Sequence, residues 1–167
     1  MHSNIKEAWV EDLRSGKFPQ ASGVLVGEIE GAVSGPEVVG YCCLGVLTHQ
    51  FVRTHPDGPL KWSDDGLQLL RRCDEEDGVE FSDEDGDWYE FSDNDLPIEV
   101  AEWAGITGDR GEGETVTFTR DDEEYTRAER DMQANPLIGG VTAIYRNDDK
   151  HETFEQIADA IEQDETL

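Results

Sequence analysis

Apolar residues recur at helical spacing in three stretches of the chain. The first predicts a helix over residues 5–15, whose apolar face is formed by Ile5, Ala8, Trp9 and Leu13. Asn4 is the expected N-cap, with Glu7 three residues further on as its capping-box partner. Gly16 is expected to end the helix.

The second stretch predicts a helix that begins at Cys42 or Cys43 and runs to about Arg53. Its apolar stripe consists of Cys43, Leu44, Leu47, Phe51 and Val52. We expect this to be the most buried helix of the chain. The chain then breaks at Pro56, Gly58 and Pro59.

The third stretch predicts a helix over residues 154–163, capped by Thr153 with Gln156 as the capping-box partner. Its stripe is Phe154, Ile157, Ala158 and Ile161. Two further helices are predicted over residues 96–105 and 121–133. The first of these two has a proline in its first turn and a glycine at its end, which is typical of helix ends.

Alternating apolar and polar residues predict β-structure between these helices. Short strands are expected over residues 24–29 and 114–120, and residues 67–70 fit either a strand or a short helical turn. Residues 79–91 predict a hairpin with an Asp- and Gly-containing turn. The whole pattern predicts an α+β fold, a single compact domain over residues 1–167 with about five helices and a small antiparallel sheet or hairpin.

Composition changes this picture mainly through charge. Forty acidic residues against 13 basic ones give a formal net charge of −27, and this self-repulsion opposes a compact state at low salt. Three explanations stay open: a high-salt environment that screens the repulsion, a basic partner, or a cation site. Only four of the basic residues are lysines. Replacement of the long apolar stem of lysine by short aspartate is typical of salt-adapted surfaces, so a halophilic source is the favoured explanation.

The acidity is concentrated in the second part of the chain. Residues 61–167 hold 33 acidic and nine basic residues, whereas residues 1–60 hold seven and four. We expect an acidic, hairpin-containing insertion at about residues 60–95, with candidate binding residues Asp83, Asp85, Asp87 and Trp88. The three aspartates have the 1, 3, 5 spacing of a calcium loop. Trp88 stands where that loop needs glycine and Asn94 where it needs glutamate, so a solvated turn is favoured over a metal site.

One motif, Tyr41-Cys42-Cys43-Leu44-Gly45, places cysteines at a predicted helix N-terminus, where a thiol can act as a nucleophile. Its base would be a histidine: His49 and His55 lie on or just after the same helix, and His151 is the distant candidate. No companion motif supports catalysis. We therefore expect packed structural cysteines and a protein that is not an enzyme, with a cysteine-dependent hydrolase as an alternative.

The sequence contains no motif for binding a cofactor, a metal, a nucleic acid or a membrane. No phosphate-binding glycine loop or zinc-ligand spacing occurs, so no cofactor and no metal are expected. No basic stripe is available for nucleic-acid phosphates. No apolar run is long enough to span a membrane, and the polar first ten residues do not predict a secretory signal.

Four sequence blocks stand out: residues 9–20, Tyr41-Cys42-Cys43-Leu44-Gly45-Val46-Leu47, residues 96–105, and Asn147-Asp148-Asp149 followed by residues 153–159. In this order they resemble a family of small uncharacterised proteins of tailed phages and proviruses. The resemblance implies a viral setting, and it implies no activity and no functional residue.

Charge and resemblance together predict a viral or proviral accessory protein, in an acidic version typical of a haloarchaeal virus. We expect it to act by protein–protein contact, for example by inhibiting a host protein. A structural or decoration protein of the virion is an alternative. The expected partners are a host protein, a viral protein or a second copy of the chain, and the expected location is the host cytoplasm or the virion.

Overall fold

The computed structural model describes residues 1–29, 39–72, 88–91, 96–106, 115–116, 147 and 151–164. Its named helices there are α1 (Ser3–Arg14), α2 (Cys43–Thr54), α3 (Ile98–Ala104) and α6 (Phe154–Gln163). The strands there are β1 (Val26–Glu28), β2 (Val39–Tyr41), β3 (Leu60–Trp62), β4 (Leu69–Arg72), β5 (Trp88–Glu90), β6 (Leu96–Pro97) and β7 (Thr115–Val116). They pair as three small antiparallel sheets, β1–β2, β3–β4–β5 and β6–β7. The fold is an α+β domain, as predicted.

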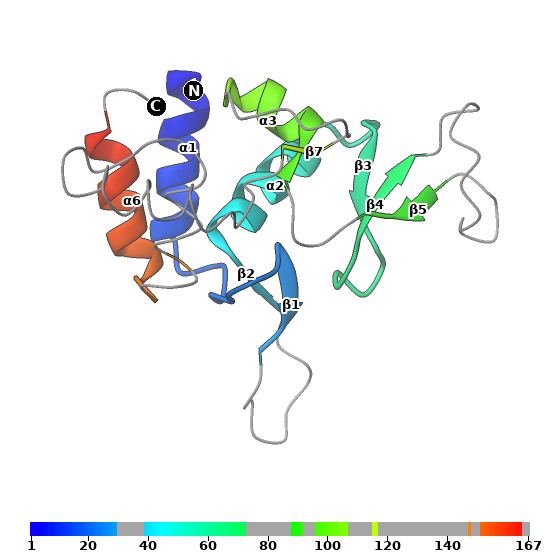
Figure 1. Ribbon diagram of the computed structural model, residues 1–167, viewed down its shortest axis with the longest axis horizontal. Coiled ribbons are helices and arrows are strands. Elements are labelled where there is room, and N and C mark those ends of the chain that lie inside the picture. Colours follow the sequence, from blue (N-terminus) through cyan, green and yellow to red (C-terminus); the bar gives the residue numbers. More distant parts are fainter. Residues whose placement is uncertain are drawn as a thin grey trace, which may run out of the picture.

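Helix α2 lies near the centre of the molecule (Figure 1). Helix α1 packs against it and has α6 along its other side, whereas the β3–β4–β5 sheet lies at the opposite end of the molecule. Helix α3 packs against α2 beside β6. The apolar stripes of α1, α2 and α6 meet in one buried core, which includes Trp9, Cys43, Leu44, Leu47, Ile157 and Ile161.

Helix α6 forms as the sequence predicts. The Thr153 hydroxyl accepts a hydrogen bond from the Gln156 backbone N–H, and the Gln156 side chain accepts one from the Thr153 N–H at 2.9 Å. This reciprocal capping box satisfies two N–H groups that the first turn would leave without partners. The predicted stripe is buried throughout, at Phe154, Ile157, Ala158 and Ile161.

The start of α1 differs from the prediction. The N-cap is His2, whose side chain makes no capping hydrogen bond, so the capping box of Asn4 and Glu7 is wrong. The His2 N–H donates to the Ala104 carbonyl oxygen at 2.8 Å, and this contact with the end of α3 determines where α1 begins. Gly16 has a φ of +67° and follows the end of α1, as predicted.

Strand pairing refines further predictions. Pro97 is the N-cap of α3 and not a residue of its first turn, because it belongs to β6, which pairs with β7. Gly105 ends α3 in the left-handed conformation, as predicted. Residues 67–70 contribute to a strand, β4, and not to a helical turn. The predicted elements over residues 79–87 and 121–133 lie outside the described residues.

Candidate functional site

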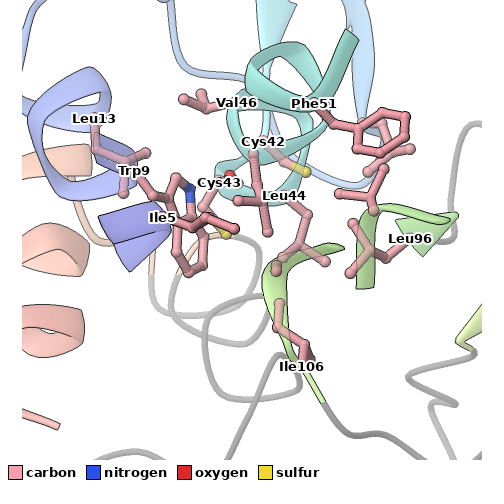
Figure 2. Close-up of a cluster of buried hydrophobic side chains, with 14 of the residues drawn as sticks. Ile5, Trp9, Leu13, Cys42, Cys43, Leu44, Val46, Phe51, Leu96 and Ile106 are labelled. Carbon is pink, nitrogen blue, oxygen red and sulfur yellow. Dashed lines mark hydrogen bonds between the residues drawn. The ribbon is translucent and has the colours of Figure 1, made fainter. Parts of the chain in front are cut away.

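Three of the four sequence blocks are joined by hydrogen bonds. The indole N–H of Trp9, in the first block, donates to the carbonyl oxygen of Cys43, in the second, at 2.9 Å (Figure 2). The side-chain amide of Gln20 donates to Asn147 Oδ1 at 2.9 Å and accepts from the Phe154 N–H at 3.0 Å, which joins the first block to the last. Trp9, Gln20 and Asn147 therefore hold separate parts of the fold together.

Gly45, in the second block, lies where another segment crosses the first turn of α2. A Cβ atom at Gly45 would lie only 2.8 Å from the carbonyl carbon of Leu25, and closer still to its oxygen. The same Leu25 oxygen accepts a hydrogen bond from the Cys42 N–H at 3.3 Å. Glycine is thus required for the close approach of the two backbones.

The two thiols of the candidate nucleophile motif belong to the core. Cys43 is 0% exposed and Cys42 is 7% exposed. Cys42 is the N-cap of α2, and its sulfur accepts a hydrogen bond from the Gly45 N–H at 3.4 Å. The ring of His49, one of the candidate bases, packs against other aromatic rings. Both cysteines are packed, as predicted, and Cys42 in addition caps α2.

The candidate binding residues separate into two groups. Asp83, Asp85 and Asp87 lie outside the described residues, whereas Trp88 begins β5. The strand register places Trp88 on the same side of the β3–β4–β5 sheet as Lys61, Leu70, Arg72 and Glu90. We call this group the Trp88 face. The opposite side of the sheet carries Leu60, Leu69 and Arg71, which are buried.

Two cations lie over the ring of Trp88. Lys61 Nζ is 4.1 Å from the ring centroid, and the guanidinium carbon of Arg72 is 5.1 Å from a ring of the same indole. Trp88 is half-buried and Arg72 is exposed. Because ammonium and guanidinium groups are attracted to the electron-rich face of an indole, these contacts fix the orientation of the ring.

An ion pair attaches this sheet to α3. The guanidinium of Arg71 donates to both carboxylate oxygens of Glu99, each at 2.7 Å, and lies over the ring of Phe91. Arg71 is only 5% exposed. Burial acts to lower the pKa of Arg71, but the hydrogen bonds and charge interactions with Glu99 and Tyr89 together outweigh burial and raise the pKa, so the cation is retained. The pair therefore positions the sheet that carries the Trp88 face.

A second group of aromatic side chains lies between β2, α2 and β3. We call it the Tyr41 cluster, and it consists of Phe18, Tyr41, His49 and Trp62. Phe18 meets His49 edge to face with 5.0 Å between ring centroids, and Tyr41 meets Trp62 in the same way at 6.0 Å. His49 and Trp62 are stacked at 6.4 Å. All four side chains are half-buried, so the cluster is part core and part surface.

The electrostatics of the Tyr41 cluster keep it neutral. Burial lowers the pKa of His49 and the nearby Arg53 lowers it further, while Asp12 opposes the shift. Burial raises the pKa of the Tyr41 hydroxyl. His49 Nδ1 and Trp62 Nε1 are buried, and neither has a hydrogen-bond partner among the described residues. Protonated His49 would thus be a charge without a partner at Nδ1.

Residues 1–165 match the model of a domain of unknown function, DUF8296. The chain belongs to the DUF8296 family. No curated protein and no solved structure matches it. Within the described part of this DUF8296 domain, no helix is long and apolar enough to cross a membrane. The same residues contain no group of three or more metal-ligating side chains.

Sequence reasoning selected Trp88 in this DUF8296 chain but missed the Tyr41 cluster. Its four members come from the segment after α1, from β2, from α2 and from β3. No periodicity connects residues so far apart, and only the packing of β2 and β3 beside α2 brings them together. The one local signal was the pair of Tyr41 and His49, which flank the apolar stripe of the second predicted helix.

Proposed function

We propose that this chain is an accessory protein of a virus or provirus that acts by contact with a host or viral protein. The observation that carries the contact role is Trp88, whose ring lies under two cations on the outward side of the β3–β4–β5 sheet. The resemblance of the four sequence blocks to tailed-phage proteins supports the viral setting. The high acidity with only four lysines supports a haloarchaeal virus.

The Trp88 face combines groups that dominate binding energy in protein interfaces. Tryptophan and arginine are enriched among the residues whose truncation costs most affinity. The cation contacts orient the Trp88 ring before binding, so less side-chain entropy is lost when a partner covers it. Leu70 adds apolar surface beside it, and Glu90 adds a carboxylate. The partner would supply an apolar pocket for the indole and an acceptor for Arg72.

The acidic residues Asp83, Asp85 and Asp87 remain proposed binding residues. They belong to the segment that connects β4 to β5 and leads directly into Trp88. We propose that a partner of the Trp88 face contacts these carboxylates as well. Basic groups on the partner would be favoured there, because complementary charges steer association and suppress wrong partners.

The burial of Cys43 supports a contact role over the alternative of a cysteine-dependent hydrolase. A nucleophilic thiolate must reach the carbon atom that it attacks. The Cys43 side chain is 0% exposed, and the Cys42 sulfur is engaged as the cap of α2. A hydrolase would need α2 to move before either sulfur met a substrate.

The test compares proteins captured from infected host cells at native salt by the tagged chain and by two variants. Trp88→Ala removes the ring, and Gln163→Ala alters an exposed residue at the end of α6 as the control. We expect a protein that the parent and the control capture in near-equal amount to the bait and that Trp88→Ala loses, while circular dichroism shows all three chains folded. An identical set of captured proteins for all three would refute the contact role of Trp88. Mass spectrometry of purified particles separates the virion alternative, which predicts the chain at stoichiometric level in virions.

A further inference from the structure

The Tyr41 cluster leaves aromatic surface open in a strongly acidic protein. Phe18, Tyr41, His49 and Trp62 pack on one another and are all half-buried, so the cluster as a whole keeps some surface in contact with solvent. Isolated apolar residues on a surface are normal, but a contiguous group of rings from four separate segments is typical of a binding surface.

Cations of the chain itself lie over other aromatic rings. Trp88 has Lys61 and Arg72 over its indole, and Phe91 has Arg71. Among the described residues, no lysine or arginine lies over Phe18, Tyr41 or Trp62 in this way. Within the part of the chain that the structure describes, no cation therefore competes with one from a partner for the electron-rich faces of these three rings.

Acidic residues close in sequence to Trp62, and on the Tyr41 side of the β1–β2 hairpin, would favour such a cation. Asp64 and Asp65 lie two and three residues after Trp62, in the turn between β3 and β4, and both are exposed. Hydrogen bonds from the Ser63 hydroxyl and the Leu67 N–H lower the pKa of Asp65, which keeps it ionised. On the β1–β2 hairpin, the register places Glu28 on the same side as Tyr41. A net charge of −27 extends this attraction over the whole molecule.

We infer that the Tyr41 cluster binds an arginine side chain presented by a partner protein. A guanidinium is planar, keeps its charge at all relevant pH values and stacks on aromatic faces better than an ammonium group does. Tyr41 and Trp62 supply the ring faces, and the carboxylates of Asp64 and Asp65 supply acceptors. Neutral His49 completes the packing without repelling the cation. This inference deepens the proposed contact function by naming a chemical group of the partner, at a surface distinct from the Trp88 face.

The test uses Nα-acetyl-arginine amide as the probe and Nα-acetyl-citrulline amide, its neutral isostere, as the control ligand. The four tryptophans of the chain give four indole N–H signals in a proton–nitrogen NMR spectrum, and the signal lost in Trp62→Phe belongs to Trp62. We expect the arginine amide to move this signal saturably, with a dissociation constant about 2- to 30-fold below that of the citrulline amide. Equal constants for the two ligands, or a Trp62 signal that stays in place, would overturn the inference.

Variants separate a binding role from a structural one. Trp62→Leu removes the ring, and Trp103→Leu is its control, because Trp103 is also half-buried but packs against Phe51 and His55. We expect only the Trp62 change to abolish the effect of the arginine amide on the ring-proton signals of His49. If Trp62→Leu does not fold, the double change Asp64→Asn and Asp65→Asn tests these two carboxylates, with Asp57→Asn at the other end of β3 as its control.

The charge change at Asp64 and Asp65 is expected to weaken arginine binding several-fold at low ionic strength, and the control change at Asp57 is not. Asparagine at position 65 keeps an acceptor for the Ser63 hydroxyl, so the turn is preserved. Equal binding by both variants would overturn the role of the Asp64 and Asp65 carboxylates. The outcome is independent of the Trp88→Ala capture experiment, so failure of one proposal is distinguishable from failure of the other.

Discussion

Replacing Gly45 with alanine tests whether the close approach of α2 to the Leu25 backbone requires glycine at position 45, in the second sequence block. Alanine at an ordinary helical position is about 1 kcal/mol more favourable than glycine, so helix propensity alone predicts stabilisation. Here the added Cβ would lie 2.8 Å from the Leu25 carbonyl carbon and 3.3 Å from Leu25 Cα. Both neighbours are backbone atoms, which cannot rotate away as the end of a side chain does.

Relief of this clash requires the segment at Leu25 to move away from α2 by about 1 Å or more. That movement breaks the hydrogen bond from the Cys42 N–H to the Leu25 oxygen and loosens Leu25, which is 1% exposed. Overpacking of a core costs about 1–3 kcal/mol, and partial loss of a buried leucine and a hydrogen bond adds to it. We expect Gly45→Ala to lower the free energy of unfolding by about 3 kcal/mol.

The assay is denaturant unfolding at native salt, followed by far-ultraviolet circular dichroism. Gly16→Ala is the matched control, because Gly16 has a φ of +67° but nothing within 4 Å of its Cβ position. The control should lose only the about 1–2 kcal/mol of a left-handed alanine. A Gly45→Ala protein as stable as the parent, or more stable, would show that the crossing does not constrain position 45.

Three further perturbations test the sheet attachment, the Tyr41 cluster and the charge. Arg71→Leu should lower the free energy of unfolding by about 3 kcal/mol, because it leaves the partly buried Glu99 carboxylate without its guanidinium partner. Adding Glu99→Leu to this variant should restore part of the lost stability. If the effects of the two changes simply added, the two side chains would not be paired. Because the pKa of His49 is lowered in the folded chain, the unfolded chain takes up a proton near pH 6.5 before the folded chain does, so the free energy of unfolding should fall as pH drops below that value. His49→Phe should make the dependence of the unfolding free energy on pH less steep between about pH 7.5 and 5.5. An unchanged dependence would exclude His49 as its cause. Thermal unfolding should shift upward from dilute buffer to molar KCl, since the net charge of −27 is screened within about 3 Å at 1 M salt; an unchanged midpoint would remove the support for a halophilic source.

Local elements could be predicted wherever the signal lies within a few residues. Helix α6 has both its capping box and its apolar stripe in eleven consecutive residues, and its start at Phe154 and its end at about Gln163 were predicted correctly. Helix α1 has an equally clear stripe, but its first residue is determined by a hydrogen bond from His2 to Ala104, about a hundred residues away. The Asn4 cap was wrong because propensity does not include such a partner.

The candidate sites also differ in whether their signal is local in the sequence or comes from contacts between distant residues. Trp88 stood out in the sequence because it follows a dense run of acids, yet the cations over its ring come from β3 and β4 and became visible only with the strand register. The Tyr41 cluster had only the local signal of Tyr41 and His49, since its rings come from four segments. The conspicuous block at residues 41–47 indicated a nucleophile as one alternative, and packing assigned it to the core.

Composition and periodicity within single elements were enough to predict the α+β class, most of the helices, the burial of Cys42 and Cys43 and the charge of −27. Tertiary structure decided where α1 begins, why position 45 is glycine, and which rings and cations meet at Trp88 and Tyr41. Each of these depends on the distance between atoms that are far apart in the sequence. Such distances are determined only when the strands and helices pack together.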